Sequence, residues 1–419
     1  MKKTKNGTLS ASQKTSIELR EYGPPASISL SSQEYDILSK YFGKCLEITL
    51  DKTRSTLNNY ICSIKAKDYI GNINLPSLML RINPKIKKLN INYMIPLAYD
   101  LEPFKESDFG YLLEKESTLF ELLVKKLSDI IEKLCKRGII KTYYENDENL
   151  PYVKGKILSR ENLIHNSILR HRAFCRYIEF GPDNTLNRIV KYTLYHLILM
   201  HLEESYLSRK LRFLLQYFEP VSLQHFDPHN DFLKITYSRL TIQYKPIIDL
   251  CKLILAKSSV NLSSTGKIQF SSFLVDMNEL FDFVIYRILS LNLNRNLTVR
   301  GGKKKIRKKI DIEKVTPIKP DIVIREVGGG RSVVIDAKYE EKYEPSHLYQ
   351  IWTYAIGLRI PVGVLVYPKN KSIENYQTTL KTTMTPAHIL TIDLTKPDPQ
   401  NFLKECKEFV VSVERIMGE

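Results

Sequence analysis

The pattern of hydrophobic and polar positions changes character along the chain. Residues 1–16 are polar, and after them short apolar runs such as Tyr60–Ile64 and Leu78–Ile82 are separated by Gly, Asn and Pro. Short runs bounded by turn residues are typical of β-strands. The pattern therefore predicts a polar tail over 1–16 and a β-rich domain over 17–110.

The middle of the chain has helical periodicity. Apolar residues recur at helical spacing over 119–137, 184–206 and 240–256, which predicts amphipathic helices. Gly138 follows the first of these runs as a C-cap, and the acidic, Asn-containing stretch Glu145–Leu150 reads as a connection. We expect a mainly helical connecting domain over 111–270.

The last third of the chain mixes the two periods. A helix is predicted over 274–291 and another over 346–358, with strands near Leu297, Asp321, Val333, Val362 and Ile389. This order predicts a mixed sheet flanked by helices over 271–419. The expected fold class is thus a multidomain α/β protein.

The composition of the chain indicates its cellular environment and the class of its binding partner. The 419 residues include 63 Lys and Arg against 46 Asp and Glu, a net charge of +17 that favours a polyanionic partner such as nucleic acid. Because no long apolar window or secretory signal is present, we expect a soluble, cytoplasmic protein with no membrane partner. The six cysteines are scattered singly, which predicts buried free thiols. The sequence has no P-loop motif.

One segment concentrates side chains that can carry chemistry. In KPDIVIREVGGGRSVVIDAKY, Asp321 begins one apolar strand, Asp336 and Lys338 end the next, and three glycines form the turn. Because side chains two apart share a face of a strand, a hairpin of this length brings both carboxylates and the ammonium to one edge. The simpler interpretation is a salt bridge between Asp321 and Lys338.

Such a trio suits phosphodiester hydrolysis. Carboxylate-bound Mg²⁺, for which Mn²⁺ can substitute, neutralises phosphoryl oxygens and activates water. Lys338 can orient or deprotonate that water, and we expect burial and the cation to lower its pKa. The sequence therefore predicts metal ligands at Asp321 and Asp336, with Lys338 as the water-activating residue.

These residues resemble the PD-(D/E)xK nuclease superfamily. Gln350 and Tyr354, on the helix that follows, are similar to the Gln/Tyr motif of its RecB-like branch. The resemblance implies that Gln350 contacts DNA phosphate or the polar part of the site, whereas on its own it reads as an exposed helical residue. In the preceding helix, Glu279 and Asp282 fall off the apolar stripe, and either is a candidate third carboxylate or simply a solvated charge.

The resemblance narrows further to the McrC family, and it covers the chain from about residue 55 onward. It is carried by DYIGNINLPSLMLRINPKI, by VKGKIL with FCRYIEFGPDNTLNRIVKYTL downstream, by DMNELFDFV and by the nuclease signature. The resemblance implies a role for Asp282 in catalysis and metal binding, although family members commonly have Glu at this position and Asp282 is the shorter acid.

The McrC resemblance implies an endonuclease subunit that cleaves modified double-stranded DNA. It also implies a partner, a hexameric McrB-like AAA+ GTPase that binds GTP, is stimulated by this chain and is engaged by the amino-terminal domain. Two other functions stay open: a non-catalytic activator of the partner NTPase, and a PD-(D/E)xK repair nuclease that acts alone.

A basic run precedes the metal-bearing strands. Its six cations are candidates for sequence-independent phosphate contacts, although a solvated loop is the simpler interpretation; Tyr354 is a further candidate DNA contact. The run comprises Lys303, Lys304, Lys305, Arg307, Lys308 and Lys309.

Overall fold

The computed structural model divides the chain into two compact units. One unit contains 1–109 and 261–419, and the other contains 110–260. The structure describes residues 15–56, 60–99, 101, 119–169, 171–200, 205–228, 230–262, 268–302, 306, 308–309 and 317–418. None of the helices in these ranges is long and apolar enough to cross a membrane. The six cysteines are all free and buried, as predicted.

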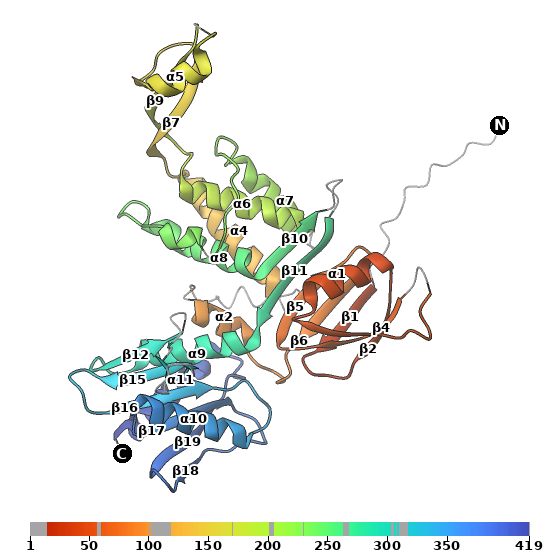
Figure 1. The fold of residues 1–419 in the computed structure, drawn as a ribbon, viewed down its shortest axis with the longest axis vertical. Coiled ribbons are helices and arrows are strands. Elements are labelled where there is room, and N and C mark those ends of the chain that lie inside the picture. Colours follow the sequence, from red (N-terminus) through yellow and green to blue (C-terminus); the bar gives the residue numbers. More distant parts are fainter. Residues whose placement is uncertain are drawn as a thin grey trace, which may run out of the picture. The chain divides into compact units, whose positions relative to one another are not determined.

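The amino-terminal part of the first unit is built on two sheets (Figure 1). One has the order β2-β4-β3, and in the other β1, β6, β5 and β11 are consecutive neighbours. The elements are β1 (Thr15–Arg20), β2 (Ala26–Leu30), α1 (Ser32–Phe42), β3 (Leu46–Leu50), β4 (Tyr60–Ala66), β5 (Tyr69–Asn74), β6 (Leu78–Asn83), α2 (Ile91–Tyr99) and β11 (Ile268–Asp276). The β-rich character expected here is therefore present.

Local sequence explains two features of this part. A capping box starts α1, because Ser31 caps the helix and Glu34 reaches back to the Ser31 backbone. Gly71 in β5 has φ 128°, and a Cβ there would lie 2.0 Å from the carbonyl oxygen of Phe273 in β11. Only glycine therefore permits this close pairing of the two strands.

The second unit combines a helical bundle with a small sheet. The helices α4 (Leu119–Arg137), α6 (Thr185–Leu199), α7 (Ser205–Gln216) and α8 (Lys245–Lys257) pack together. The periodicity predicted α4, α6 and α8, but it extended the second helix to residue 206, whereas α6 ends at Leu199 and α7 is a separate helix that was not predicted. The sheet has the order β7-β9-β8 and carries one helix; its elements are β7 (Thr142–Leu150), β8 (Lys156–Ile157), α5 (Ser159–Asn166) and β9 (Ala173–Gly181). We call 142–181 the lobe.

The lobe corrects one prediction. Glu145–Leu150 is not a connection but two thirds of β7, which pairs along its whole length with β9. The remaining elements of the unit are the short helices η1 (Asp231–Lys234) and η2 (Ile242–Tyr244), and β10 (Ser258–Leu262) spans the boundary between the units.

The carboxy-terminal part of the first unit is a mixed six-stranded sheet with the order β12-β15-β16-β17-β19-β18. Its parallel pairs are β16 with β17 and β17 with β19, whereas the other pairs are antiparallel. The elements are α9 (Met277–Asn292), β12 (Leu297–Gly301), β13 (Lys308–Lys309), β14 (Pro317–Ile318), β15 (Ile322–Glu326), β16 (Ser332–Ala337), α10 (Pro345–Leu358), β17 (Val362–Pro368), β18 (Tyr376–Leu380), β19 (Thr385–Ile392) and α11 (Pro399–Gly418).

Helices flank this sheet, as predicted. Helix α10 packs on β16, β17 and β19, while α9 contacts β12 and β16, and α11 contacts β19. All seven residues of β17 are buried, which is typical of a strand covered on both faces. Val334 shares the core of α10, so the side chains of β16 at even positions face that helix.

Candidate active site

The three residues of the predicted trio meet at one edge of the carboxy-terminal sheet. Strands β15 and β16 form an antiparallel hairpin with Ile322 opposite Ile335, and glycines 328–330 all have positive φ in its turn. Asp321 immediately precedes β15, and Asp336 and Lys338 lie at the end of β16. The alternation argument placed these three side chains correctly relative to one another.

Contacts at this edge are short. The Oδ2 atom of Asp321 accepts a hydrogen bond of 2.9 Å from the backbone N–H of Ala337. The Nζ atom of Lys338 lies 2.7 Å from Oδ2 of Asp336, whose side chain is 3% exposed. The contact is an ion pair, and by geometry this oxygen accepts no hydrogen bond from the described residues.

The pKa of Asp321 is raised well above its usual range. Burial is the largest cause, and the neighbouring charges of Asp336 and Asp282 add to it. Carboxylates this close repel one another when all are ionised, so one of them holds a proton unless a cation is bound. The site therefore has the electrostatic character of a cation-binding site.

Lys338 departs from the expectation. Burial is the largest single cause and acts to lower its pKa, but the interactions with Asp336 and the charge of Asp321 together outweigh burial, and the pKa is raised. The predicted lowering is therefore wrong for the protein without a cation, in which the ammonium is held protonated by its ion pair. A cation between the carboxylates would weaken that hold.

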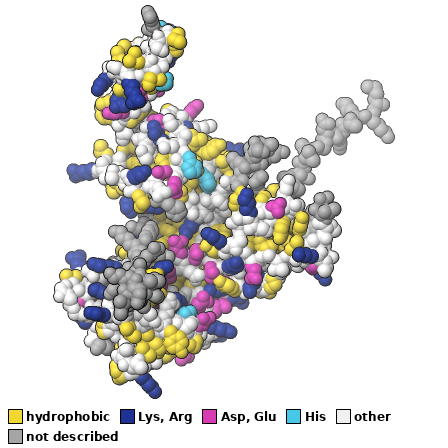
Figure 2. All heavy atoms as spheres, viewed as in Figure 1, with side chains coloured by type: hydrophobic (Ala, Val, Ile, Leu, Met, Phe, Trp, Pro, Cys, Tyr) yellow, Lys and Arg dark blue, Asp and Glu magenta, His cyan; other side chains and the backbone are white. Residues whose placement is uncertain are grey.

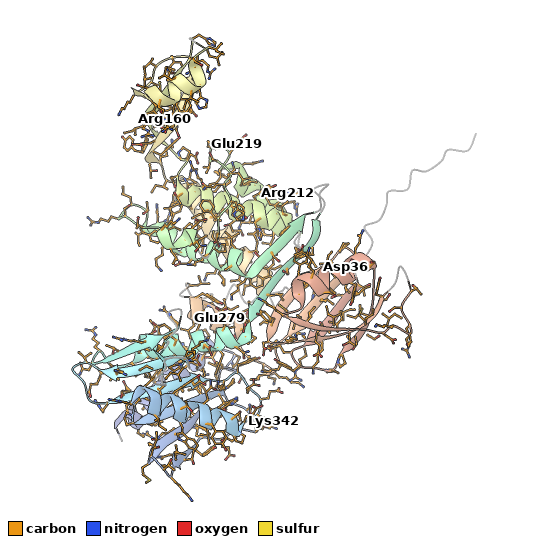
Figure 3. All side chains as sticks on the ribbon, in the orientation of Figure 1. Asp36, Arg160, Arg212, Glu219, Glu279 and Lys342 are labelled. Carbon is orange, nitrogen blue, oxygen red and sulfur yellow. The ribbon has the colours of Figure 1, made fainter. Side chains whose placement is uncertain are left out.

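The charges of the two candidate acids of α9 act on different groups. The charge of Asp282 acts on the pKa of Asp321, whereas the charge of Glu279 acts on Tyr99 of α2. Glu279 also belongs to the first turn of α9, which Asp276 caps, and Figure 3 labels Glu279 on this helix. Asp282 is therefore the acid of α9 whose charge reaches Asp321.

Gln350 and Tyr354 lie one turn apart on α10. Nε2 of Gln350 donates a 2.7 Å hydrogen bond to the hydroxyl of Tyr354. The Tyr354 ring belongs to the hydrophobic core beneath the helix, and its pKa is raised by burial and then by the charge of Asp336. The hydroxyl and the amide thus lie beside the carboxylates, while the buried ring is poorly available for stacking on DNA bases.

His347 is a neighbour of the site that the sequence interpretation missed. Its Nδ1 atom lies 2.7 Å from the hydroxyl of Tyr367 in β17, and its pKa is lowered by burial and by the charge of Lys338. The signal was present in the spacing, because residues 347, 350 and 354 occupy one face of a helix.

The structure does not test the basic run. Lys303, Lys304, Lys305 and Arg307 lie outside the described residues, and for Lys308 and Lys309 only the backbone, in β13, is described. Their role in phosphate binding stays a prediction.

The donor set fits a hard cation that keeps part of its water shell. Within the described ranges, no three His, Cys, Asp or Glu side chains form a ready metal cage. Mg²⁺ does not need one, since it is commonly held by one or two carboxylates with water completing its octahedron. Asp321 and Asp336 supply two carboxylates, and Oδ2 of Asp336, which has Lys338 as an ionic partner but accepts no hydrogen bond from the described residues, is a buried oxygen that a cation could also bind.

Comparisons with known proteins assign the chain to a family. The model of the family described as McrBC 5-methylcytosine restriction system component matches residues 64–368. A relative from Escherichia coli (strain K12), the Type IV methyl-directed restriction enzyme EcoKMcrBC, is 25% identical over 307 residues, which are 68% of this chain and 86% of the relative.

A solved structure has a similar fold. It is the half-complex from the tetradecameric assembly of Thermococcus gammatolerans McrB AAA+ hexamers with bound McrC, with a TM-score of 0.61 and 20% identity, covering 95% of this chain and all of that chain. This likeness concerns the fold, while the family match spans well over half of the sequence. The chain therefore belongs to the McrBC 5-methylcytosine restriction system component family.

Proposed function

We propose that this chain is the nuclease subunit of an McrBC-type restriction system and cleaves modified, methylated DNA in a Mg²⁺-dependent reaction. The observation that carries the proposal is the meeting of Asp321, Asp336 and Lys338 at one end of the β15–β16 hairpin. Two carboxylates and an ammonium at the edge of a mixed sheet suit a PD-(D/E)xK site. Membership of the restriction family supplies the substrate class.

Each side chain of the site has a proposed role. Asp321 and Asp336 hold Mg²⁺, for which Mn²⁺ can substitute, and Asp282 adds negative charge to the same position. When bound, the ion neutralises the phosphoryl oxygens and lowers the pKa of water. Lys338 orients the attacking water and, once its ion pair with Asp336 is weakened, can take the proton from it.

The α10 residues and the basic run complete the proposal. Gln350 is oriented by its hydrogen bond to Tyr354, which leaves its amide oxygen to accept a hydrogen bond from a site water or from Lys338. The basic run (303–309) neutralises the DNA backbone without reading its sequence. Binding by this run would therefore weaken steeply as salt is added.

We also propose that an McrB-like AAA+ hexamer binds this chain, hydrolyses GTP and is stimulated by it, so that the nucleotide is bound by the partner. Exposed apolar side chains on the lobe support a protein partner: Leu163, Ile164 and Ile168 are 71%, 64% and 90% exposed. Figure 2 shows such hydrophobic side chains gathered there among basic ones. Exposed patches of this kind mark interaction sites, and the amino-terminal domain is a second candidate surface.

The decisive experiment replaces Asp336 by Asn. The variant keeps the size of the side chain but loses the charge that holds both the cation and Lys338. With partner, GTP, Mg²⁺ and methylated duplex DNA, cleavage should fall by about 10³-fold or more, because metal stabilisation of the transition state amounts to several kcal/mol. Stimulation of the partner GTPase should stay within about twofold of the wild type, the margin of an unaltered contact.

A matched control is Asp393→Asn. Asp393 is a half-buried carboxylate after β19 in the same unit, bound to Thr395 and Lys396, and this variant should cut like the wild type. Undiminished cleavage by the Asp336 variant would contradict the proposed mechanism. Absence of cleavage in the wild type, with GTPase stimulation intact, would favour a non-catalytic activator; cleavage without any partner would favour a stand-alone nuclease.

A further inference from the structure

A cluster of charged and polar side chains, three of them buried, involves the two residues that follow Lys338. We call Glu21, Lys85, Tyr339 and Glu340 the clamp. Strands β1 and β6 are parallel neighbours, and Glu21 and Lys85 come just after their ends, where the N–H of Glu21 bonds to the carbonyl of Asn83. The first unit thus brings two amino-terminal residues to the segment that leaves β16.

The clamp is closely connected. Oε2 of Glu21 accepts hydrogen bonds from the hydroxyl of Tyr339 at 3.0 Å and from the backbone N–H of Lys85 at 2.9 Å. The Nζ atom of Lys85 lies 3.1 Å from Oε2 of Glu340 and 4.6 Å from the centroid of the Tyr339 ring. One ammonium and one carboxylate therefore hold two consecutive residues that follow Lys338.

The depth of these charges is unusual for a joint between domains. Glu21 and Lys85 are 1% and 4% exposed, and Tyr339 is 2% exposed. Charges are rarely buried so fully, and packed apolar residues of similar volume commonly stabilise a joint as well or better. Within the described residues, the second carboxylate oxygen of Glu21 has no hydrogen-bond partner. These polar contacts therefore add little stability, but because they are directional they favour one position of Tyr339 and Glu340 over others.

Because Tyr339 is the next residue in the chain, its position restricts the position of the Cα atom of Lys338. The N–H of Lys338 bonds to the carbonyl of Val366 in β17, and the N–H of Glu340 bonds to the carbonyl of Lys338. The Tyr339 ring also lies near Phe281 of α9, with 6.2 Å between the ring centroids. A shift of Tyr339 would therefore move the backbone of Lys338 relative to Asp336.

We propose that the clamp is a positioning device through which the amino-terminal domain sets the place of Lys338 in the active site. Glu21, Lys85 and Tyr339 are positioning residues, since they touch Lys338 only through the chain. This inference rests on the proposed nuclease function and adds to it a direct connection between the amino-terminal sheet and the water-activating lysine.

Two variants and one control test the clamp. Tyr339→Phe removes only the hydroxyl that bonds to Glu21, and Lys85→Met removes the ammonium but keeps most of the chain length. Lys85→Arg retains the charge. Glu341→Gln is the control, because it breaks the exposed pair of Arg20 and Glu341, at 3.0 Å, between the same two segments.

The first measurement is single-turnover cleavage of methylated DNA by the full chain with its partner, GTP and Mg²⁺. We expect the rate constant to fall about tenfold in Tyr339→Phe and about 30-fold or more in Lys85→Met, since displacements near 1 Å cost up to about 100-fold. KM for DNA and the melting temperature should stay near wild-type values. Lys85→Arg should recover most of the rate, and Glu341→Gln should keep it within about twofold.

The second measurement needs no cleavage. Acylation of Lys338 by an amine reagent, followed by mass spectrometry and normalised to Lys396, should increase several-fold in Tyr339→Phe and Lys85→Met but not in Glu341→Gln. Unchanged rates and unchanged acylation in folded variants would overturn the clamp. A rate that falls only with the folded fraction would also overturn it. Wild-type protein that cuts nothing would overturn the proposed function, while the acylation pattern still decides on the clamp.

Discussion

Charged side chains are usually exposed and large apolar side chains usually buried. The end of strand β16 breaks the first part of this rule, and the lobe breaks the second. At the end of β16, Asp336 is 2% exposed and Lys338 is largely covered beside it. In the lobe, which Figure 3 shows around the label of Arg160 in α5, large apolar side chains face solvent. One region hides charge and the other displays hydrophobic surface.

The two departures have different physical consequences. Buried charge is tolerated at β16 because each group has a partner of opposite charge or a backbone donor. Exposed apolar surface in the lobe has no such compensation within the described chain, since none of the residues of β7 and only three residues of β9 are buried. The first arrangement is typical of a site for an ion and the second of a site for another protein.

The strongest test of this comparison makes the lobe polar. We expect Leu163→Asp combined with Ile168→Asp to lower GTPase stimulation and partner-dependent cleavage about 100-fold or more, as for two interface hot spots. Melting temperature should hardly change, because both side chains are already exposed. The measurement is partner GTPase activity at several concentrations of this chain.

The matched control for the lobe is Leu403→Asp. Leu403 is 54% exposed on α11, in the other unit, and its replacement should leave stimulation unchanged. If both the lobe variant and the control stimulated normally, exposed apolar surface in the lobe would not mark the partner site.

Local periodicity accounts for what the sequence predicted well. The helix expected at 346–358 is α10 (Pro345–Leu358), and the hairpin around glycines 328–330 occurs where the two apolar runs placed it. The ribbon of β7 and β9 was missed because TYYENDENL is acidic and rich in Asn, residues with low β-propensity. Its strand pairing, from Thr142 opposite Gly181 to Leu150 opposite Ala173, is long-range and leaves no local signal.

The active site was likewise predicted where local periodicity decides the arrangement and missed where tertiary packing decides it. The period of two was enough to bring Asp336 and Lys338 together, but it could not choose between the two acids of α9, because that choice depends on how the helix packs. The clamp was beyond sequence reasoning, since Glu21 and Tyr339 are 318 positions apart. Contacts of that separation are set by tertiary structure alone.

A second test concerns the end of β16 and measures how Mg²⁺ affinity depends on pH. Because burial and the charges of Asp336 and Asp282 raise the pKa of Asp321, the free site holds a proton at neutral pH that the cation must displace. Mg²⁺ affinity should therefore rise with pH, by about tenfold per unit while one proton is released. Titration calorimetry at pH 6, 7 and 8 measures this, with cleavage prevented by omitting DNA.

The control for this test is Asp321→Asn, in which the titrating group is removed. Its Mg²⁺ affinity should be weak and much less dependent on pH. An affinity in the wild type that did not change between pH 6 and 8 would show that the buried carboxylates are ionised before the cation arrives, contrary to the expected proton release.

The smallest expected effect concerns the buried charge of the clamp. Burial raises the pKa of Glu21 from 4.5 to about 7, against the opposing hydrogen bonds of Lys85 and Tyr339. Between these values the folded chain binds a proton that the unfolded chain does not, so stability falls as pH rises and levels off above about 7. From pH 6 to 8 this contribution amounts to about 1 kcal/mol, and urea unfolding of Glu21→Gln should lack it.

Glu34→Gln is the appropriate comparison for that last variant. Glu34 is also a buried carboxyl in the amino-terminal part, but hydrogen bonds from Ser77 and Ser31 outweigh its burial and lower its pKa. Its loss should therefore destabilise the protein by a constant amount from pH 6 to 8 and change the pH dependence only in acid, where the wild-type carboxylate becomes protonated. If the free energy of unfolding of Glu21→Gln and of the wild type varied with pH in parallel, Glu21 would be ionised throughout, with its buried charge fully balanced by Lys85 and Tyr339.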